Sequence, residues 1–302
     1  MRKATQLLLP TGLPAIERLR GEGIEIENDE HAGCGGYAHR RLRVALLNLM
    51  PFKEETETDF VRLLTASSMP VELVLMKLRT HTPKHTSAEH MSRFYLSFDE
   101  LKDTGIDGLM VTGAPVEQLD FEEVTYWEEL KRIFSWAQSS AVPTLYICWA
   151  AQAGLYFHYG IPKYSLPRKK FGIFPQTILD TSLPLFSGIA NPFPMPHSRH
   201  TEIHREDVLA DERLQILAQS PVSGVSIVSA RGGAEIFVTG HMEYASHTLG
   251  NEYRRDYSKR DDVDLPVNYF TDDNPEREPL VSWRESADKF FDNWLRYYVA
   301  KI

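Results

Sequence analysis

The chain has 302 residues, with 33 Lys and Arg against 42 Asp and Glu, which gives a formal net charge of −9 at pH 7. That acidic balance argues against nucleic acid as a partner, because neutralising phosphates needs a surplus of basic surface. Apolar residues make up 42% and charged residues 25%, which is ordinary globular usage, so nothing points to disorder or a fibrous repeat.

The cysteine count and the apolar stretches bear on the location of the protein. Two cysteines, Cys34 and Cys148, are too few for a disulfide framework, and the N-terminus does not read as a secretory leader. We therefore expect a cytoplasmic protein. The longest apolar stretch, residues 141–157, is interrupted by Pro143 and Gly154 and falls short of the roughly 20 residues that span a bilayer. The sequence thus predicts no membrane segment.

The first predicted element is a strand over residues 42–50. It is aliphatic on both faces and stops at Pro51, which is typical of a parallel strand that is covered on both sides. Thr56 can cap the helix that follows, and acidic residues in its first turn suit the helix dipole.

The same alternation continues through the first half of the chain. The predicted elements are a strand over 71–78, a helix over 91–96, a strand over 108–111, a helix over 126–137, a strand over 144–148 and a helix over 150–159. Thr86 with Glu89 forms a capping box before the second helix. This rhythm predicts an α/β fold with a doubly wound, mostly parallel sheet and helices on both faces, with the active site beyond the carboxyl ends of the strands.

The second half is less regular. Residues 162–196 are rich in proline and are interpreted as long connections, whereas 214–218, 224–230 and 235–239 are strand candidates. An aromatic-rich helix is predicted over 287–299. Nothing resembles a flexible linker, so we expect a single domain over 1–302, with an N-terminal extension (1–40) and a core (41–302).

Cys148 is a candidate nucleophile because it stands between an apolar strand and a helical segment. A thiol at such a corner is lifted to the edge of the sheet at a helix N-terminus, where the dipole lowers its pKa from about 8.5. The alternative is that Cys148 fills the core, because free cysteine is among the most buried residue types.

A base and a carboxylate occur together in residues 240–244, Gly-His-Met-Glu-Tyr. In extended backbone the side chains of His241 and Glu243 point the same way, so the carboxylate can orient the imidazole and stabilise its protonated form. The other ring nitrogen could then face a thiol, which makes a Cys148-His241-Glu243 triad sterically plausible. A surface histidine beside a surface glutamate is the alternative.

Six short motifs occur in order along the chain: NLMP (48–51), VTGAP (111–115), CWAAQ (148–152), PHSR (196–199), GHMEY (240–244) and NYF (268–270). Together they closely resemble the homoserine O-acyltransferases of methionine biosynthesis, of the type built on the class I glutamine-amidotransferase fold. The resemblance implies that Cys148 accepts an acyl group from acyl-CoA and that His241 then activates the hydroxyl of homoserine. Splitting the transfer into two steps is the advantage of covalent catalysis.

The resemblance also implies which residues contact the substrates. Lys169, Ser198 and Arg255 fall on substrate-contacting positions of the family, and the planar two-pronged donor of Arg255 suits the α-carboxylate of homoserine. In isolation Arg255 could lie on a solvated face, Lys169 could meet the phosphates of CoA, and Ser198 could be a turn residue. Candidate oxyanion-hole donors are the backbone amides near Gly113 and Ala114 and at Trp149.

Glu117 predicts the acyl group. In the resembling family, glycine at this position accompanies succinyl transfer and glutamate accompanies acetyl transfer. A carboxylate in the acyl pocket takes the space of a longer chain and repels the free carboxylate of a succinyl group. We therefore expect acetyl-CoA and L-homoserine as substrates, no cofactor, and a homodimer as the resemblance suggests; succinyl-CoA is the alternative donor.

Two other functions remain open at this point. A cysteine hydrolase or amidotransferase could use the same fold, although Tyr146 and Ala150 replace the glycines that flank the nucleophile of glutamine amidotransferases. A non-catalytic metabolite sensor would have no need of a nucleophile with its base. The histidines at 81, 85 and 90 and at 197, 200 and 204 lack a full ligand set, so we expect no metal.

Overall fold

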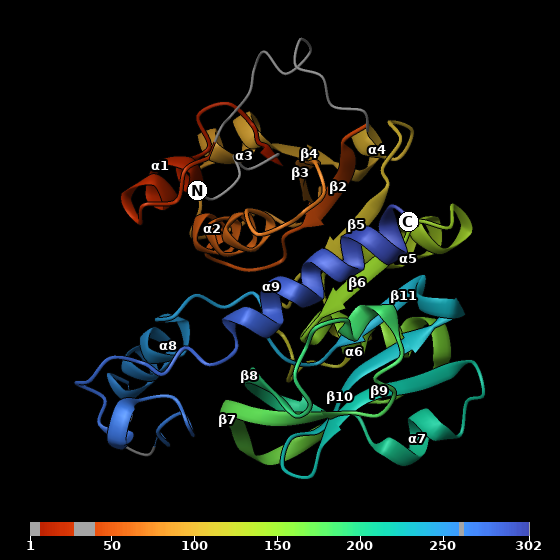
Figure 1. Cartoon of the computed structure of the whole chain (residues 1–302). Coiled ribbons are helices and arrows are strands. Elements are labelled where there is room, and N and C mark those ends of the chain that lie inside the picture. The colour runs from red at the N-terminus through yellow and green to blue at the C-terminus, as the bar shows by residue number, and fades with distance from the viewer. Residues whose placement is uncertain (1–6, 27–39, 260–262, 302) are drawn as a thin grey trace.

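The computed structural model describes residues 7–26, 40–259 and 263–301 (Figure 1). Its strands are β1 (Leu7–Leu8), β2 (Leu42–Leu47), β3 (Val71–Lys77), β4 (Tyr95–Ser97), β5 (Gly108–Val111), β6 (Thr144–Ile147), β7 (Tyr164–Ile178), β8 (Phe193–Glu202), β9 (Leu214–Ser220), β10 (Gly224–Ala230) and β11 (Glu235–Val238). Its α-helices are α1 (Pro14–Gly21), α2 (Lys53–Leu64), α3 (Ala88–Phe94), α4 (Phe98–Leu101), α5 (Trp127–Ser139), α6 (Trp149–Tyr159), α7 (Arg205–Leu209), α8 (Thr248–Tyr257) and α9 (Arg284–Asn293).

These strands form one sheet in the order β1-β3-β2-β5-β6-β11-β10-β9-β7-β8, with β4 beside β3. Pairing is parallel from β1 to β11 and antiparallel from β11 to β8. The predicted α/β class with a mostly parallel sheet is confirmed. The antiparallel strands β10, β9, β7 and β8 extend one side of it.

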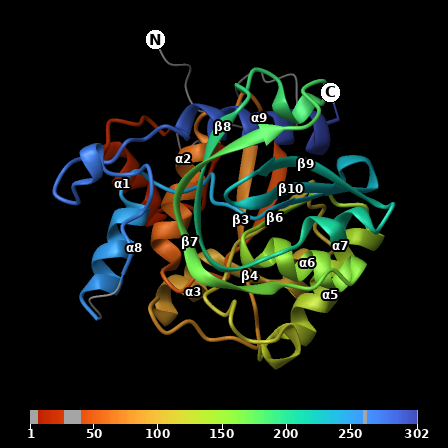
Figure 2. The same ribbon diagram turned by 90° about the horizontal axis from the view of Figure 1, so that it is seen from below.

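Both faces of the sheet are covered, which explains why the predicted strands are apolar on both sides. Along β2, Leu46 packs in one buried cluster with Phe60 of α2 and with Trp294, while the next residue, Leu47, packs in a second cluster with Ile133 of α5. The two clusters lie on opposite faces because successive side chains of a strand alternate. Figure 2 shows α9 on one side of the strands and α5 and α6 on the other.

The prediction of long connections over residues 162–196 is wrong where β7 and β8 lie, and only residues 179–192 connect these two strands. The predicted range contains all of β7 and the first part of β8, which pair antiparallel with Ile173 opposite Pro196 and Pro175 opposite Pro194. Pro194 and Pro196 are tolerated because β8 is an edge strand, where a missing N–H breaks no ladder on the open side, and Pro175 lies outside Thr177 and Ile178, by which β7 pairs with β9. Figure 2 shows β7 as a long, curved strand.

Two predicted helix caps are also displaced. The helix after β2 begins at Lys53, so Thr56 lies in its first turn and donates its hydroxyl to the carbonyl of Phe52. The cap of α3 is Ser87 rather than Thr86, because the Ser87 hydroxyl accepts the backbone N–H of His90 at 3.1 Å. Because Thr86 and Ser87 have similar side chains, the local backbone conformation decides which of them caps the helix.

Part of the N-terminal segment packs on the sheet. Strand β1 pairs in parallel with β3, and Arg18 of α1 forms an ion pair of 2.6 Å with Glu54 of α2. The division into an extension (1–40) and a core (41–302) of one domain stays a prediction. Within the described residues, every helix is too short or too polar to cross a membrane.

The parallel strands bring the sequence motifs together. Since β2, β5, β6 and β11 run the same way, the loops that follow them meet at one edge of the sheet. The strand order reverses direction between β2 and β5, and such a switch point opens a crevice where α/β proteins bind ligands. Ile147 of β6 stands opposite Val238 of β11, so Cys148 and the segment that carries His241 leave the sheet side by side.

Candidate active site

Cys148 sits on a strained turn between β6 and α6. Its backbone angles are φ 53° and ψ −114°, a conformation that costs a non-glycine residue about 1–3 kcal/mol and is found chiefly at functional sites. The backbone N–H of Cys148 donates to the carbonyl of Val238 at 2.7 Å, which fixes the turn to β11. The thiol therefore lies at the N-terminus of α6, as predicted, in a geometry like a nucleophile elbow.

His241 and Glu243 form a buried pair beside this thiol. Nδ1 of His241 lies 2.6 Å from Oε1 of Glu243, and the two residues are 3% and 6% exposed. The histidine backbone N–H donates to the carbonyl of Pro196 at 2.8 Å, which ties the loop to β8. The carboxylate thus holds one ring nitrogen and leaves the other, Nε2, for a different partner.

That partner is Cys148. Burial lowers the pKa of His241, but the charge of Cys148, the charge of Glu243 and hydrogen bonds from the ring to both raise this pKa well above its usual value. Tyr244 stacks on the imidazole, with ring centroids 4.1 Å apart and planes at 16°. The structure therefore brings together the three residues that the sequence proposed as a triad, in an environment that favours a charged imidazole.

Gly113 borders the thiol and the imidazole from the loop after β5. A Cβ added to this glycine would lie 3.2 Å from Cβ of Cys148, which is tight enough to push on it, and 3.7 Å from Cε1 of His241, which is an ordinary contact. The loop is held by Thr112, whose hydroxyl accepts the backbone N–H of Leu49 at 2.7 Å. The backbone of Gly113 and Ala114 and the first turn of α6 at Trp149 thus adjoin the thiol, where candidate oxyanion donors are expected.

Glu117 lies in a polar network that leads to α6. Its Oε2 accepts the backbone N–H of His200 at 2.8 Å and lies 3.4 Å from the hydroxyl of Thr201, which also donates to Gln152 at 2.8 Å. Buried Arg199 interacts electrostatically with both Glu117 and Cys148. Glu117 is a candidate from the sequence, whereas Arg199, Gln152 and Thr201 join it only through the pairing of β8 with the loops.

Two of the predicted substrate residues meet at Glu252 of α8. Nζ of Lys169 lies 3.3 Å from Oε2 of Glu252, and the hydroxyl of Ser198 donates to the same oxygen. The hydroxyl of Tyr244, which stacks on His241, donates to Oε1 at 2.9 Å. Glu252 therefore joins the predicted substrate site to the triad. Its only signal in the sequence is its place in a charged run, three residues before Arg255.

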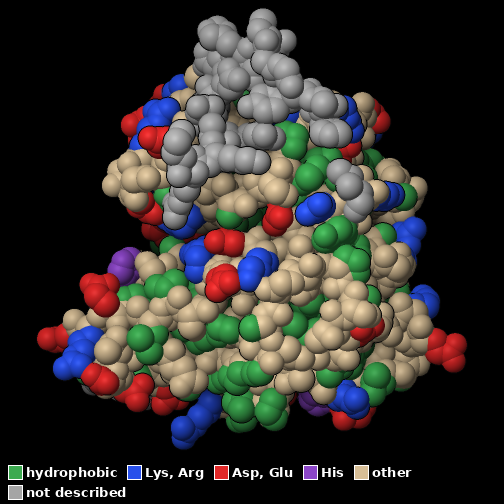
Figure 3. Space-filling model, in the orientation of Figure 1, with side chains coloured by type: hydrophobic (Ala, Val, Ile, Leu, Met, Phe, Trp, Pro, Cys, Tyr) green, Lys and Arg blue, Asp and Glu red, His purple; other side chains and the backbone are tan. Residues whose placement is uncertain are grey.

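Arg255 lies on the same helix but is more exposed. Its side chain is 49% exposed and its Nε forms an ion pair of 2.8 Å with Oδ1 of Asp256. Glu252 and Tyr244 both act electrostatically on its guanidinium, so it faces the same region as Glu252. Figure 3 shows side chains of both charges gathered at the lower left, where Figure 1 places α8.

The histidines that could suggest a metal lie apart from one another. In the described part of the chain, no group of three His, Cys, Asp or Glu residues could hold a metal ion. His90 is buried against Glu57, with Nε2 2.8 Å from its carboxylate. His197 is buried between Gln176 and Arg199. Cys34 lies outside the described residues.

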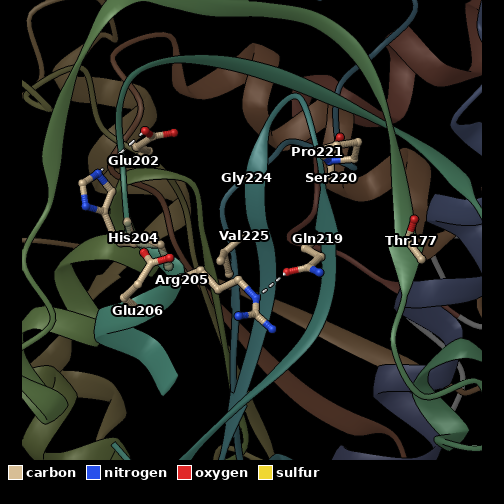
Figure 4. Close-up of a pocket in the computed structure, with 11 residues that line it drawn as sticks. Thr177, Glu202, His204, Arg205, Glu206, Gln219, Ser220, Pro221, Gly224 and Val225 are labelled. Atoms are coloured by element: carbon tan, nitrogen blue, oxygen red, sulfur yellow. Dashed lines mark hydrogen bonds and ion pairs between the residues drawn. The ribbon is translucent and has the colours of Figure 1, made fainter. Parts of the chain in front are cut away.

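A cavity of about 440 Å³ opens between the end of β8, the start of α7 and the turn from β9 to β10 (Figure 4). Nε of Arg205 donates to Gln219 at 3.2 Å across it, and Nε2 of His204 lies 3.9 Å from Glu202. None of the predicted site residues is among those that line it. Its lining carries charges of both signs and therefore does not favour one class of ligand.

Comparison with known proteins connects this site to one family. The family model described as homoserine O-succinyltransferase matches residues 6–302. The chain is 51% identical to homoserine O-acetyltransferase of Bacteroides thetaiotaomicron, over 97% of this chain and 95% of that protein. It is 50% identical to homoserine O-acetyltransferase of Brevibacillus brevis, over 96% of this chain and 94% of that protein.

Solved structures agree on the fold. A glutamine amidotransferase from Thermotoga maritima matches 86% of this chain and 99% of its own length, with a TM-score of 0.59 and 12% identity. A glutamine amidotransferase from Methylobacillus flagellatus matches 86% of this chain and 95% of its own, with a TM-score of 0.53 and 10% identity. At such low identity the likeness concerns the fold alone, and it agrees with the predicted glutamine-amidotransferase-like class.

Proposed function

Because the chain belongs to the homoserine O-succinyltransferase family, we propose that it transfers an acetyl group from acetyl-CoA to the hydroxyl of L-homoserine through a thioester on Cys148. The observation that carries this proposal is the strained Cys148 turn, with the His241 ring bonded to the thiol on one side and to Glu243 on the other. The products are O-acetyl-L-homoserine and CoA.

The first step forms the acetyl-enzyme. The thiolate of Cys148 attacks the carbonyl carbon of acetyl-CoA, and the carbonyl oxygen becomes an oxyanion that faces the backbone amides near Gly113, Ala114 and Trp149. Each such donor is typically worth about 10²–10³ in rate. The thiolate of CoA then leaves and takes the proton of the His241 imidazolium, while the acetyl group stays on sulfur.

The second step discharges the acetyl group. Neutral His241 removes the proton from the homoserine hydroxyl as its oxygen attacks the thioester carbonyl, and the thiolate of Cys148 leaves. Glu243 holds the ring by Nδ1, and its charge stabilises the imidazolium that forms, as in other triads. The enzyme returns to the thiolate and imidazolium pair with which it began.

The contacts of Glu117 support acetyl over succinyl transfer. Its carboxylate is held by His200 and Thr201 on the β8 side of the nucleophile helix, so it occupies a fixed position. Two like charges about 4 Å apart at an effective dielectric near 20 cost about 4 kcal/mol, which is enough to reverse a preference between donors. Succinyl-CoA, the donor implied by the name of the family, would bring its free carboxylate against this charge.

The surroundings of Glu252 support a site for homoserine. Its carboxylate suits the α-ammonium group of the substrate, and Lys169 and Arg255 suit the α-carboxylate. In the free enzyme these groups pair among themselves, Lys169 with Glu252 and Arg255 with Asp256. A zwitterionic amino acid supplies a carboxylate to Lys169 and an ammonium group to Glu252, so neither charge of that pair is left without a partner, which favours an α-amino acid as acceptor.

Mass spectrometry of the intact protein tests the covalent step. After brief exposure to acetyl-CoA, we expect a mass gain of one acetyl group on Cys148, and addition of homoserine should remove it. Cys148→Ala should gain no such mass. A wild-type enzyme that releases CoA only with homoserine present, and never carries an acetyl group, would contradict the ping-pong scheme.

Glutamine hydrolysis and donor choice test the alternatives. An amidotransferase would release ammonia from glutamine, and a sensor would bind homoserine without turnover.

Replacing Glu117 with Gly should raise the use of succinyl-CoA relative to acetyl-CoA, and Glu117→Gln separates the effect of the charge from that of the side-chain volume. No gain in either variant would count against the role of Glu117.

We further propose that the protein is a cytoplasmic homodimer. Light scattering of the purified protein tests the oligomeric state.

A further inference from the structure

The side chain of Gln152 joins the helix of the nucleophile to strand β8. Gln152 lies on α6, four residues after Cys148, and is buried. Its backbone N–H donates to the carbonyl of Cys148 at 3.3 Å, so about one helical turn separates the two residues. Its side-chain amide hydrogen bonds to buried Thr201 of β8 in two places. No step of the proposed reaction uses this contact.

The two hydrogen bonds use both ends of the amide. Nε2 of Gln152 donates to the backbone carbonyl of Thr201 at 3.3 Å, and Oε1 accepts the hydroxyl of Thr201 at 2.8 Å. The carbonyl is an acceptor only, so it needs a donor beside it, and this requirement sets which way round the amide lies. The contact therefore fixes both the main chain and the side chain of Thr201 relative to α6.

The same end of β8 holds the carboxylate of Glu117. His200, next to Thr201, donates its backbone N–H to Oε2 of Glu117 at 2.8 Å, and the Thr201 hydroxyl lies 3.4 Å from the same oxygen. The hydroxyl has a single proton, and its shorter bond is the one to Gln152. The main restraint on the carboxylate is thus the His200 N–H, whose position depends on the strand end that Gln152 holds.

The backbone of Glu117 is held from another direction. Nζ of Lys163 donates to the carbonyl of Glu117 at 2.6 Å, and this bond involves neither Gln152 nor Thr201. Loss of the contact between Gln152 and Thr201 would therefore free the Glu117 carboxylate and leave its main chain anchored.

We propose that Gln152 and Thr201 are positioning residues for the choice of acyl donor. Through the end of β8 they keep the Glu117 carboxylate at a fixed distance from the helix that carries Cys148. This inference rests on the proposed function, in which that carboxylate opposes the free carboxylate of succinyl-CoA. Because the repulsion between two charges falls with their separation, a carboxylate that can turn away no longer excludes the longer donor.

Thr201→Val removes the hydroxyl and keeps the shape of the side chain. We expect the ratio of kcat/KM for succinyl-CoA to kcat/KM for acetyl-CoA to rise about tenfold, because the Glu117 carboxylate is then less firmly held. Thr201→Ser keeps the hydroxyl and should keep the ratio near the wild-type value. Thr177→Val, at an exposed threonine of β7, is the matched control and should leave the ratio unchanged.

A double variant shows whether Thr201 acts through Glu117. With Glu117→Gly no carboxylate remains to be positioned, so adding Thr201→Val should change the ratio by less than about twofold. A further tenfold rise in this background would show that Thr201 shapes the acyl pocket itself, and it would overturn the inference.

Gln152→Leu tests the same contact from α6 and covers the case in which Thr201→Val does not fold. It removes both bonds to Thr201, while Nη1 of Arg199 still donates to the Thr201 carbonyl at 2.6 Å. The donor ratio should again rise about tenfold. A purely structural role would lower kcat/KM for both donors alike, together with the thermal midpoint, and leave the ratio unchanged; that result would overturn the inference.

The outcomes separate this inference from the proposed function. If the wild type forms no acetyl-Cys148 at all, the proposed function fails. If the wild type is acetylated and Glu117→Gly gains use of succinyl-CoA, an unchanged ratio in both Thr201→Val and Gln152→Leu contradicts the positioning role alone.

Discussion

At the scale of single residues, the site depends on how closely backbone and side chains approach one another. Cys148 adopts a positive φ, and Gly113 has no side chain to keep the β5 loop away from the thiol. Both features bring groups within reach that a relaxed chain would separate. Small changes at these positions should therefore alter the reaction more than the stability of the fold.

Gly113→Ala is predicted to lower the rate of acetyl-enzyme formation. The new methyl group would stand 3.2 Å from Cβ of Cys148 and displace the backbone amides that we propose as oxyanion donors, so we expect a loss of about 10²-fold in kcat. Stopped-flow release of CoA measures this step. Gly21→Ala, at a glycine whose added Cβ meets nothing within 4 Å, is the control. An equal loss in both variants would indicate a general effect on folding.

Glu243→Gln is predicted to shift the pH dependence of acylation. The negative charges of Glu243 and Cys148 keep the pKa of His241 well above its usual value, so the imidazolium persists above neutral pH. Without the charge of Glu243 this pKa falls, and the imidazolium is lost at a lower pH. The basic limb of kcat/KM for acetyl-CoA should move down, with a loss of about 10²-fold in rate. A limb that stays in place would show that Glu243 only positions the ring.

At the scale of elements, helix α8 and strand β8 form the proposed acceptor side of the site. Strand β8 presents Ser198 and holds His241 through Pro196, and α8 presents Glu252 to both Ser198 and Lys169. The strands of this region were not predicted, because its proline-rich composition favours loops. The pairing of an edge strand depends on partners far along the chain, and local propensity does not specify those partners.

Glu252→Gln is predicted to weaken the binding of homoserine. The neutral amide no longer balances the α-ammonium group, so KM for homoserine should rise about tenfold to a hundredfold, while KM for acetyl-CoA stays near the wild-type value. Initial-rate measurements with each substrate varied in turn provide both constants. Glu206→Gln, outside this network, is the control. A rise confined to acetyl-CoA would place Glu252 on the donor side instead.

At the scale of the whole molecule, one sheet joins the parallel strands that carry Cys148 to the antiparallel strands beside them. Leu46 of β2 and Ile227 of β10 stand far apart in the strand order and are both fully buried in the same apolar cluster. A continuous core of this kind predicts that the two regions unfold together, as expected for the single domain predicted from the sequence.

Leu46→Ala and Ile227→Ala test this coupling. Each leaves a cavity in the core and should lower the free energy of unfolding by about 2–5 kcal/mol. If the chain is one domain, both variants should shift the same single transition in calorimetry. Two transitions, each shifted by only one of the variants, would divide the chain into independent parts.

The sequence by itself determined the alternation of strands and helices in the first half of the chain, the corner at Cys148 and the pairing of His241 with Glu243. These features depend on neighbours within a few residues, where hydrophobic period and side-chain spacing act directly. The family resemblance added Lys169, Ser198, Arg255 and Glu117 as candidates.

Only the tertiary structure decided which distant groups meet. The bond from His241 to Cys148 and the place of Glu252 between Lys169 and Tyr244 both join segments far apart in the chain. The same holds for β7 and β8. Their positions follow from packing and pairing over the whole sheet, and the free energy of such contacts exists only once the chain has folded.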